Sequence, residues 1–167
     1  MEDRWDSLVS RIQQGVQQAE AIKKPTPYER PASVIKREAY AFTLNQMVSH
    51  ADMSTLQDVI EYVIEDGAQF ADDEERKRAP LKPKFEQNPF HWVFAGLAFK
   101  FKLTRDDVLR FGRQLLYAHR HEVPVELLIG FIYQSGTPDE ISRKAKGNAG
   151  EIWRDTYIAN LRKKARA

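Results

Sequence analysis

The placement of its eight prolines constrains the fold of this chain more than any other feature, because proline fixes φ and lacks the backbone donor that a helix interior needs. Each lies in a predicted connector or loop, or at the start of a predicted helix. Between them, apolar residues recur with the 3.6-residue period of helices, on one side or all round. The sequence therefore predicts an all-α protein, a compact domain of seven or eight helices. The prolines are Pro25, Pro27, Pro31, Pro80, Pro83, Pro89, Pro124 and Pro138.

The first segment is predicted to be an amphipathic helix over residues 3–23, followed by a Pro-rich connector. We divide the chain into an association helix (1–24), an extended connector (25–33) and a helical domain (34–167). The apolar stripe of the first helix is a candidate surface for a protein partner or a second copy of the chain. The alternative is that it folds back onto the body of the protein. The stripe residues proposed for partner binding are Trp5, Leu8, Ile12 and Val16.

Local signals place the later helices. Ser33 is predicted to cap a helix that reaches about His50, and Gly67 to end an amphipathic helix over residues 55–66. Charged residues and prolines between 71 and 89 predict the principal loop. Further helix starts are predicted at Asn88 with Pro89, at Thr104 with Asp107, at Pro124, at Thr137 and at Asn148. Phe99, Phe101 and Leu103 alternate with lysines, a period of two that is too short to assign.

Several classes of function are disfavoured by what the sequence lacks. With no cysteine there is no disulfide, thiolate zinc site or cysteine nucleophile. No apolar run is long enough to cross a bilayer and no signal peptide is visible, so we expect a cytoplasmic protein without membrane contact. His119 and His121 are two residues apart and point away from each other on a helix. We therefore expect no enzyme activity, metal, cofactor or small-molecule substrate.

Charge is distributed unevenly along the chain. Residues 1–75 hold 7 Lys and Arg against 15 Asp and Glu, whereas residues 76–167 hold 19 against 9. The first part therefore has a net charge of −8 and the second of +10. Such a split makes an anionic partner for the second half the first hypothesis to test.

Residues 137–165 resemble a helix-turn-helix, a short helix and a turn followed by a basic helix. In that motif the second helix reaches base edges while neighbouring Lys and Arg contact phosphate. The alternative is a pair of packed helices with a solvated basic tail. The candidate nucleic-acid-binding residues of this segment are Arg143, Lys144, Lys146, Asn148, Arg154, Arg162, Lys163 and Arg166.

A second basic surface is predicted on the helix that starts at Thr104. Arg110, Arg113, Tyr117 and Arg120 combine positive charge with an aromatic ring, which is typical of surfaces that follow a phosphate backbone. The alternative is an ordinary solvated helix face.

The helix over residues 55–66 carries an acidic outer face. Asp58, Glu61 and Glu65 are candidates for binding a basic protein partner. The alternative is that the basic half of the same molecule neutralises them.

These features favour a small non-enzymatic accessory or regulatory protein that binds nucleic acid through its basic half, DNA in preference to RNA. The N-terminal helix would then provide self-association, for example as a homodimer. The alternative function is a protein-interaction adaptor or inhibitor that acts through the N-terminal helix and the acidic helix face.

Overall fold

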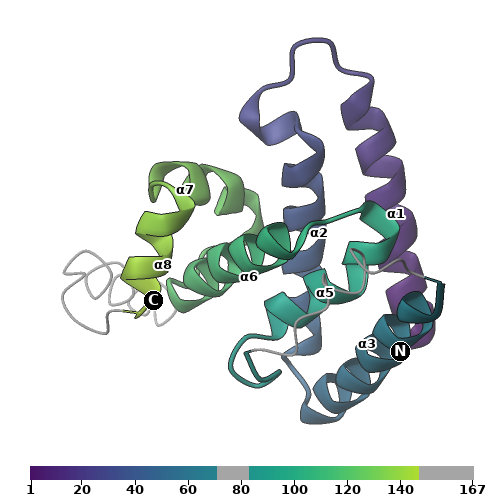
Figure 1. The fold of residues 1–167 in the computed structure, drawn as a ribbon. Coiled ribbons are helices and arrows are strands. Elements are labelled where there is room, and N and C mark those ends of the chain that lie inside the picture. Colours follow the sequence, from purple (N-terminus) through teal and green to yellow (C-terminus); the bar gives the residue numbers. More distant parts are fainter. Residues whose placement is uncertain (71–82, 147–167) are drawn as a thin grey trace, which may run out of the picture.

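The computed structural model describes residues 1–70 and 83–146. Within these ranges the protein has seven α-helices, two 3-10 helices and no strand, which confirms the predicted all-α class (Figure 1). The elements are α1 (Glu2–Glu20), η1 (Pro27–Glu29), α2 (Pro31–Gln46), α3 (His50–Phe70), α5 (Pro89–Phe101), α6 (Arg105–Arg120), η2 (Val125–Leu127), α7 (Leu128–Gln134) and α8 (Pro138–Lys146).

The N-terminal helix is part of the body of the protein. Figure 1 shows α1 and α2 side by side as a helical hairpin, with the Pro-rich connector at its tip. The two helices approach closely at Gly15, where an added Cβ would lie 2.6 Å from Cγ1 of Val34. The stripe of α1 therefore folds back onto its own chain, which was the alternative to an exposed association helix.

The connector spans residues 21–30 rather than 25–33, and it is less extended than predicted. η1 forms within it, and α2 starts at Pro31 with Arg30 in the N-cap position. Ser33 is not the cap, because it lies inside α2, where its hydroxyl donates to the carbonyl of Pro27. Proline at the first helical position accounts for the earlier start, since its fixed φ suits that position.

The third helix is longer than predicted at both ends. His50 begins α3 instead of closing the preceding helix, and α3 continues past Gly67 to Phe70. Gly67 is needed for packing rather than for ending the helix. A Cβ at this position would lie 2.6 Å from Cδ2 of Phe99 on α5.

Helix α5 is the centre of the core, as its sequence predicts. Residues 89–98 are all buried, and α5 contacts α2, α3 and α6. The side chain of Asn88 accepts from the backbone N–H of His91 at 3.1 Å and Pro89 follows it, which confirms the predicted start. The alternating segment after Ala98 is helical up to Phe101. Lys102 then ends the helix in the left-handed conformation, with φ 54°.

Helix α6 starts with the predicted capping box. The Thr104 hydroxyl accepts from the N–H of Asp107, and the Asp107 carboxylate accepts from the N–H of Thr104, both at 3.0 Å. After α6 the chain passes through η2 and α7. The start of α8 is also confirmed, by reciprocal 3.3 Å bonds between Thr137 and Glu140. Pro124 precedes η2 rather than opening a long helix. In Figure 1, α7 and α8 lie on the opposite side of α6 from α1 and α3.

Candidate functional site

Most of the apolar stripe of α1 is buried in the core and is not available to a partner. Trp5, Leu8 and Ile12 are 4%, 0% and 0% exposed and belong to the main core, where Trp5 makes an edge contact with Phe42. Val16 is half-buried and packs against the same core. The assignment of Leu8, Ile12 and Val16 to partner binding is therefore wrong, because other helices already cover them, whereas Trp5 also lines a groove.

The acidic face of α3 is exposed, as predicted. Asp58, Glu61 and Glu65 all face solvent. The Glu61 carboxylate accepts from the amide of Gln57 at 3.2 Å, and neither Asp58 nor Glu65 forms an ion pair within the described residues. Tyr62 lies one turn from Asp58 on the same face and is 65% exposed. In the described part of the chain these carboxylates are not neutralised by basic side chains of the protein itself.

A groove of about 580 Å³ borders this face, between α1, α3 and α5. Its apolar lining residues include Trp5, Val9, Val63 and Phe99. The charged residues that line it are Asp6, Asp66 and Lys100. Tyr62 is common to the groove and the acidic face, so the two surfaces are continuous. We define the acidic groove as this cavity together with Asp58, Glu61 and Glu65.

Two glycines shape the acidic groove. Gly67 of α3 lies against the ring of Phe99, and Gly96 of α5 lies against Trp5, where a Cβ would be 2.8 Å from Cη2. A side chain at either position would therefore push an aromatic ring away from the body of the protein. Because neither glycine has a Cβ, the rings of Phe99 and Trp5 lie close to the helix backbones, which leaves space for the groove.

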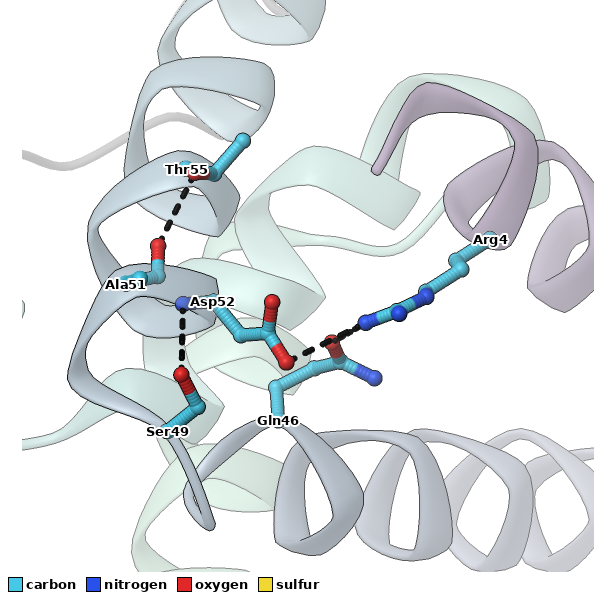
Figure 2. A network of polar contacts seen from close by, with 6 residues as sticks. All are labelled: Arg4, Gln46, Ser49, Ala51, Asp52 and Thr55. Atoms are coloured by element: carbon cyan, nitrogen blue, oxygen red, sulfur yellow. Dashed lines mark hydrogen bonds and ion pairs between the residues drawn. The ribbon is translucent and has the colours of Figure 1, made fainter.

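Polar contacts attach the N-terminal end of α1, one wall of the groove, to the other helices. Figure 2 shows the guanidinium of Arg4 between two acceptors, with Gln46 Oε1 at 3.1 Å and Asp52 Oδ2 at 3.2 Å. The hydroxyl of Ser49 accepts from the N–H of Asp52 at 3.3 Å at the start of α3. The ion pair is largely exposed, so it orients α1 more than it stabilises the fold.

Two other grooves in the described residues differ in character. One of about 530 Å³ between α1 and α2 is flanked by the pair of Arg11 with Glu38, whose charges already compensate each other. The other, of about 380 Å³, lies beside Tyr28 and Leu127 and contains a single carboxylate, that of Glu126. Of these three grooves, the acidic groove alone combines a mainly apolar lining with a continuous carboxylate surface.

The predicted basic surface of α6 is only partly formed. Arg110, Arg113 and Arg120 are exposed, but Arg110 donates to Asp107 at 2.6 Å. Tyr117 is 2% exposed and stacks on Phe131 of α7 at 5.6 Å between ring centroids. Its assignment to nucleic-acid binding is therefore wrong, because α7 covers the side of α6 that carries Tyr117.

The helix-turn-helix-like segment is described only as far as its first helix. On α8, Arg143 is exposed and Lys144 donates to the carbonyl of Ser135 at 2.9 Å. Helix α8 packs against α6, so the two predicted basic surfaces are carried by adjoining helices. The remaining predicted residues lie outside the described side chains. They are Lys146, Asn148, Arg154, Arg162, Lys163 and Arg166.

Lys36 on α2 is a candidate that sequence reasoning missed. Its Nζ lies 4.4 Å from the ring centroid of Phe111, and the guanidinium carbon of Arg110 lies 5.5 Å from the same centroid. Burial, followed by the positive charge of Arg110, lowers the pKa of Lys36 from 10.5 to about 8, while Asp107 opposes the change. The available signal was a lysine inside a helix with apolar residues on two sides.

Two histidines, His91 and His119, pack against other residues of the protein. His91 is 1% exposed, within α5. His119, near the end of α6, contacts the ring of Phe90 at 5.7 Å, and burial lowers its pKa. The described ranges contain no group of three or more His, Asp or Glu residues arranged to hold a metal ion. No helix in them is both long and apolar enough to cross a membrane.

Comparison with known proteins gives no family for this chain. No protein-family model, no curated protein and no solved structure matches it.

Proposed function

We propose that this protein is a non-enzymatic interaction adaptor whose acidic groove binds a basic amphipathic helical segment of a partner protein. The observation that carries the proposal is the continuity of the groove between α1, α3 and α5, which has apolar side chains in its lining, with exposed carboxylates of α3. An amphipathic helix places its apolar face in such a groove and its charged residues along the rim.

Charge complementarity selects a basic partner. Asp6 and Asp66 line the cavity, and Asp58, Glu61 and Glu65 continue the negative surface, against the single cation Lys100. Each exposed ion pair contributes about 0.2–1 kcal/mol. Several such pairs steer association and fix orientation, while the apolar contacts supply most of the affinity.

Fluorescence anisotropy with a labelled helical peptide of Leu and Lys tests the proposal. We expect saturable binding that weakens with salt, and no binding of a matched peptide in which Glu replaces every Lys. Asp6→Lys with Asp66→Lys should weaken binding about tenfold, since two attractive contacts become repulsive. Glu20→Lys is the control, because Glu20 is exposed on the same helix about 20 Å from Asp6.

A second variant tests the shape of the groove independently of charge. Gly67→Ala places a methyl group against Phe99, whose ring must move. We expect weaker peptide binding with an unchanged helical circular dichroism spectrum. Equal affinity of wild type and the Asp6→Lys, Asp66→Lys protein for the basic peptide would refute the proposed function.

Nucleic-acid binding is the second candidate, and the packing of α8 against α6 favours it. Arg113, Arg120 and Arg143 are exposed on these adjoining helices. We expect mobility shifts of random duplex DNA that weaken steeply with salt. Arg113→Ala with Arg143→Ala should lower the slope of log affinity against log salt by about 2. Absence of DNA binding at low ionic strength would refute this candidate. The variants of the acidic groove, such as Gly67→Ala, are the control, because they leave α6 and α8 unchanged.

A further inference from the structure

The ammonium group of Lys36 forms no ion pair with any residue that the structure describes. The side chain is half-buried between α2 and α6 and lies over the ring of Phe111, with Nζ 4.4 Å from the centroid. Within the described part of the chain no carboxylate or hydrogen-bond acceptor lies within bonding distance of Nζ. A half-buried ammonium group that contacts an aromatic ring and forms no hydrogen bond with the described residues keeps its N–H donors for another partner.

Asp107, the carboxylate that acts on the charge of Lys36, is already engaged in hydrogen bonds. Asp107 accepts from the backbone N–H of Thr104 through Oδ2 at 3.0 Å and from Arg110 through Oδ1 at 2.6 Å. The first bond belongs to the capping box of α6, which holds the carboxylate in place. Asp107 therefore pairs with Arg110, and no carboxylate of the described residues forms an ion pair with Lys36.

Both cations lie next to one aromatic ring. Arg110 is within 5.5 Å of the Phe111 centroid, and its side chain is 43% exposed, so donors of its guanidinium remain accessible to a ligand. Lys36 comes from α2 and Arg110 from α6, and these helices are in contact. The tertiary structure thus brings together two positive charges that are 74 positions apart in the sequence.

We propose that Lys36 and Arg110 form a binding site for a phosphate group, with the Phe111 ring beneath it. A phosphate offers several acceptor oxygens, enough for the ammonium donors and the guanidinium fork together. This site goes beyond the adaptor function, since it uses no residue of the acidic groove. The lowered pKa of Lys36 supports the proposal, because an ammonium with an unfavourable charge environment gains most from an anion.

Acetylation of the full-length protein by limiting acetic anhydride, quantified for each lysine by mass spectrometry, tests the site. Only the unprotonated amine reacts, so at pH 7 Lys36 should react faster than exposed lysines. Inorganic phosphate should raise the pKa of Lys36 and slow its acetylation, by about tenfold if the pKa moves from about 8 to about 9. Lys102, which is exposed, is the internal reference, and chloride keeps the ionic strength constant.

Arg110→Ala tests the second residue of the site. We expect this variant to lose most of the phosphate protection of Lys36 while remaining folded. Arg105→Ala is the matched control, because Arg105 is an exposed cation at the start of the same helix, and it should keep the protection. Protection that survives Arg110→Ala, or phosphate that slows Lys36 no more than Lys102, would overturn the proposal.

The source of the phosphate group is decided by a second arm of the experiment. A short single-stranded oligodeoxynucleotide is compared with inorganic phosphate at equal phosphate concentration. Protection at lower concentrations of the oligonucleotide identifies a phosphodiester of a nucleic acid as the ligand. Protection by inorganic phosphate alone identifies a free phosphate anion. If neither slows Lys36, the site does not bind phosphate, and the acidic groove remains to be judged by its own peptide assay.

Discussion

Truncation of Ile12 measures how strongly α1 is attached to the body of the protein. Its side chain is 0% exposed and belongs to the main core. Ile12→Ala removes three carbon groups, which amounts to about 2.4 kcal/mol at roughly 0.8 kcal/mol each. Incomplete collapse of the resulting cavity adds about 1 kcal/mol. We therefore expect the free energy of unfolding to fall by about 3–4 kcal/mol.

Urea unfolding followed by circular dichroism gives this value, with Ile12→Val and Val16→Ala as controls. Ile12→Val should cost about 1 kcal/mol. Val16 is half-buried, so its truncation should cost less than that of Ile12. A loss below about 0.5 kcal/mol for Ile12→Ala would refute the packing of α1 into the core. Molar mass measured alongside shows whether the variant exposes the stripe and self-associates.

Three further predictions concern stability. Lys36→Met should stabilise the protein at pH 7 by about 1–2 kcal/mol, because the lowered pKa penalises the charged form in the folded state. As the pH rises from about 8 to 10.5, the free energy of unfolding of the wild type should increase relative to that of Lys36→Met, because in this range only the unfolded chain keeps the proton on Lys36. A difference between the two proteins that stays constant with pH in urea unfolding would contradict this prediction. Lys102→Gly should stabilise the protein by about 0.5–1 kcal/mol, because φ at Lys102 is 54°, which favours glycine. Lys100→Gly, inside α5, should destabilise it. If both substitutions change the melting temperature in the same direction, strain at Lys102 is unimportant. Thr104→Ala should cost about 1 kcal/mol by removing the cap of α6, and Thr104→Ser should restore most of it in the same melts.

The acidic groove illustrates how packing and surface chemistry are linked in this fold. Trp5 serves the core and also lines the cavity, so its complete removal would confound folding with binding. Asp6 and Asp66 are exposed and can be reversed without disturbing the core. For this reason charge reversal at these two positions, rather than truncation of an aromatic residue, separates adaptor function from stability.

Local signals in the sequence determined where three of the seven described α-helices begin. The starts of α5, α6 and α8 depend on hydrogen bonds between residues three positions apart, namely Asn88 to His91, Thr104 to Asp107 and Thr137 to Glu140. Such bonds need no distant partner, so the residue types and their spacing were enough to predict them. The all-α class and the exposed acidic face of α3 followed from the same kind of periodic reasoning.

Only the tertiary structure decided which neighbour covers each face. The apolar stripe of α1 could pack against a second copy of the chain or against the body of its own chain, and the sequence alone does not decide between them. Tyr117 is buried because α7 covers it. Gly67 lies inside α3, where Phe99 occupies the space that a Cβ would need. The groove and the Lys36–Arg110 cluster likewise exist only where separate helices meet. The period of apolar residues defines a face of a helix. Whether that face is buried, and whether a charged side chain has an oppositely charged neighbour, depends on residues that are distant in sequence and meet only in the folded chain.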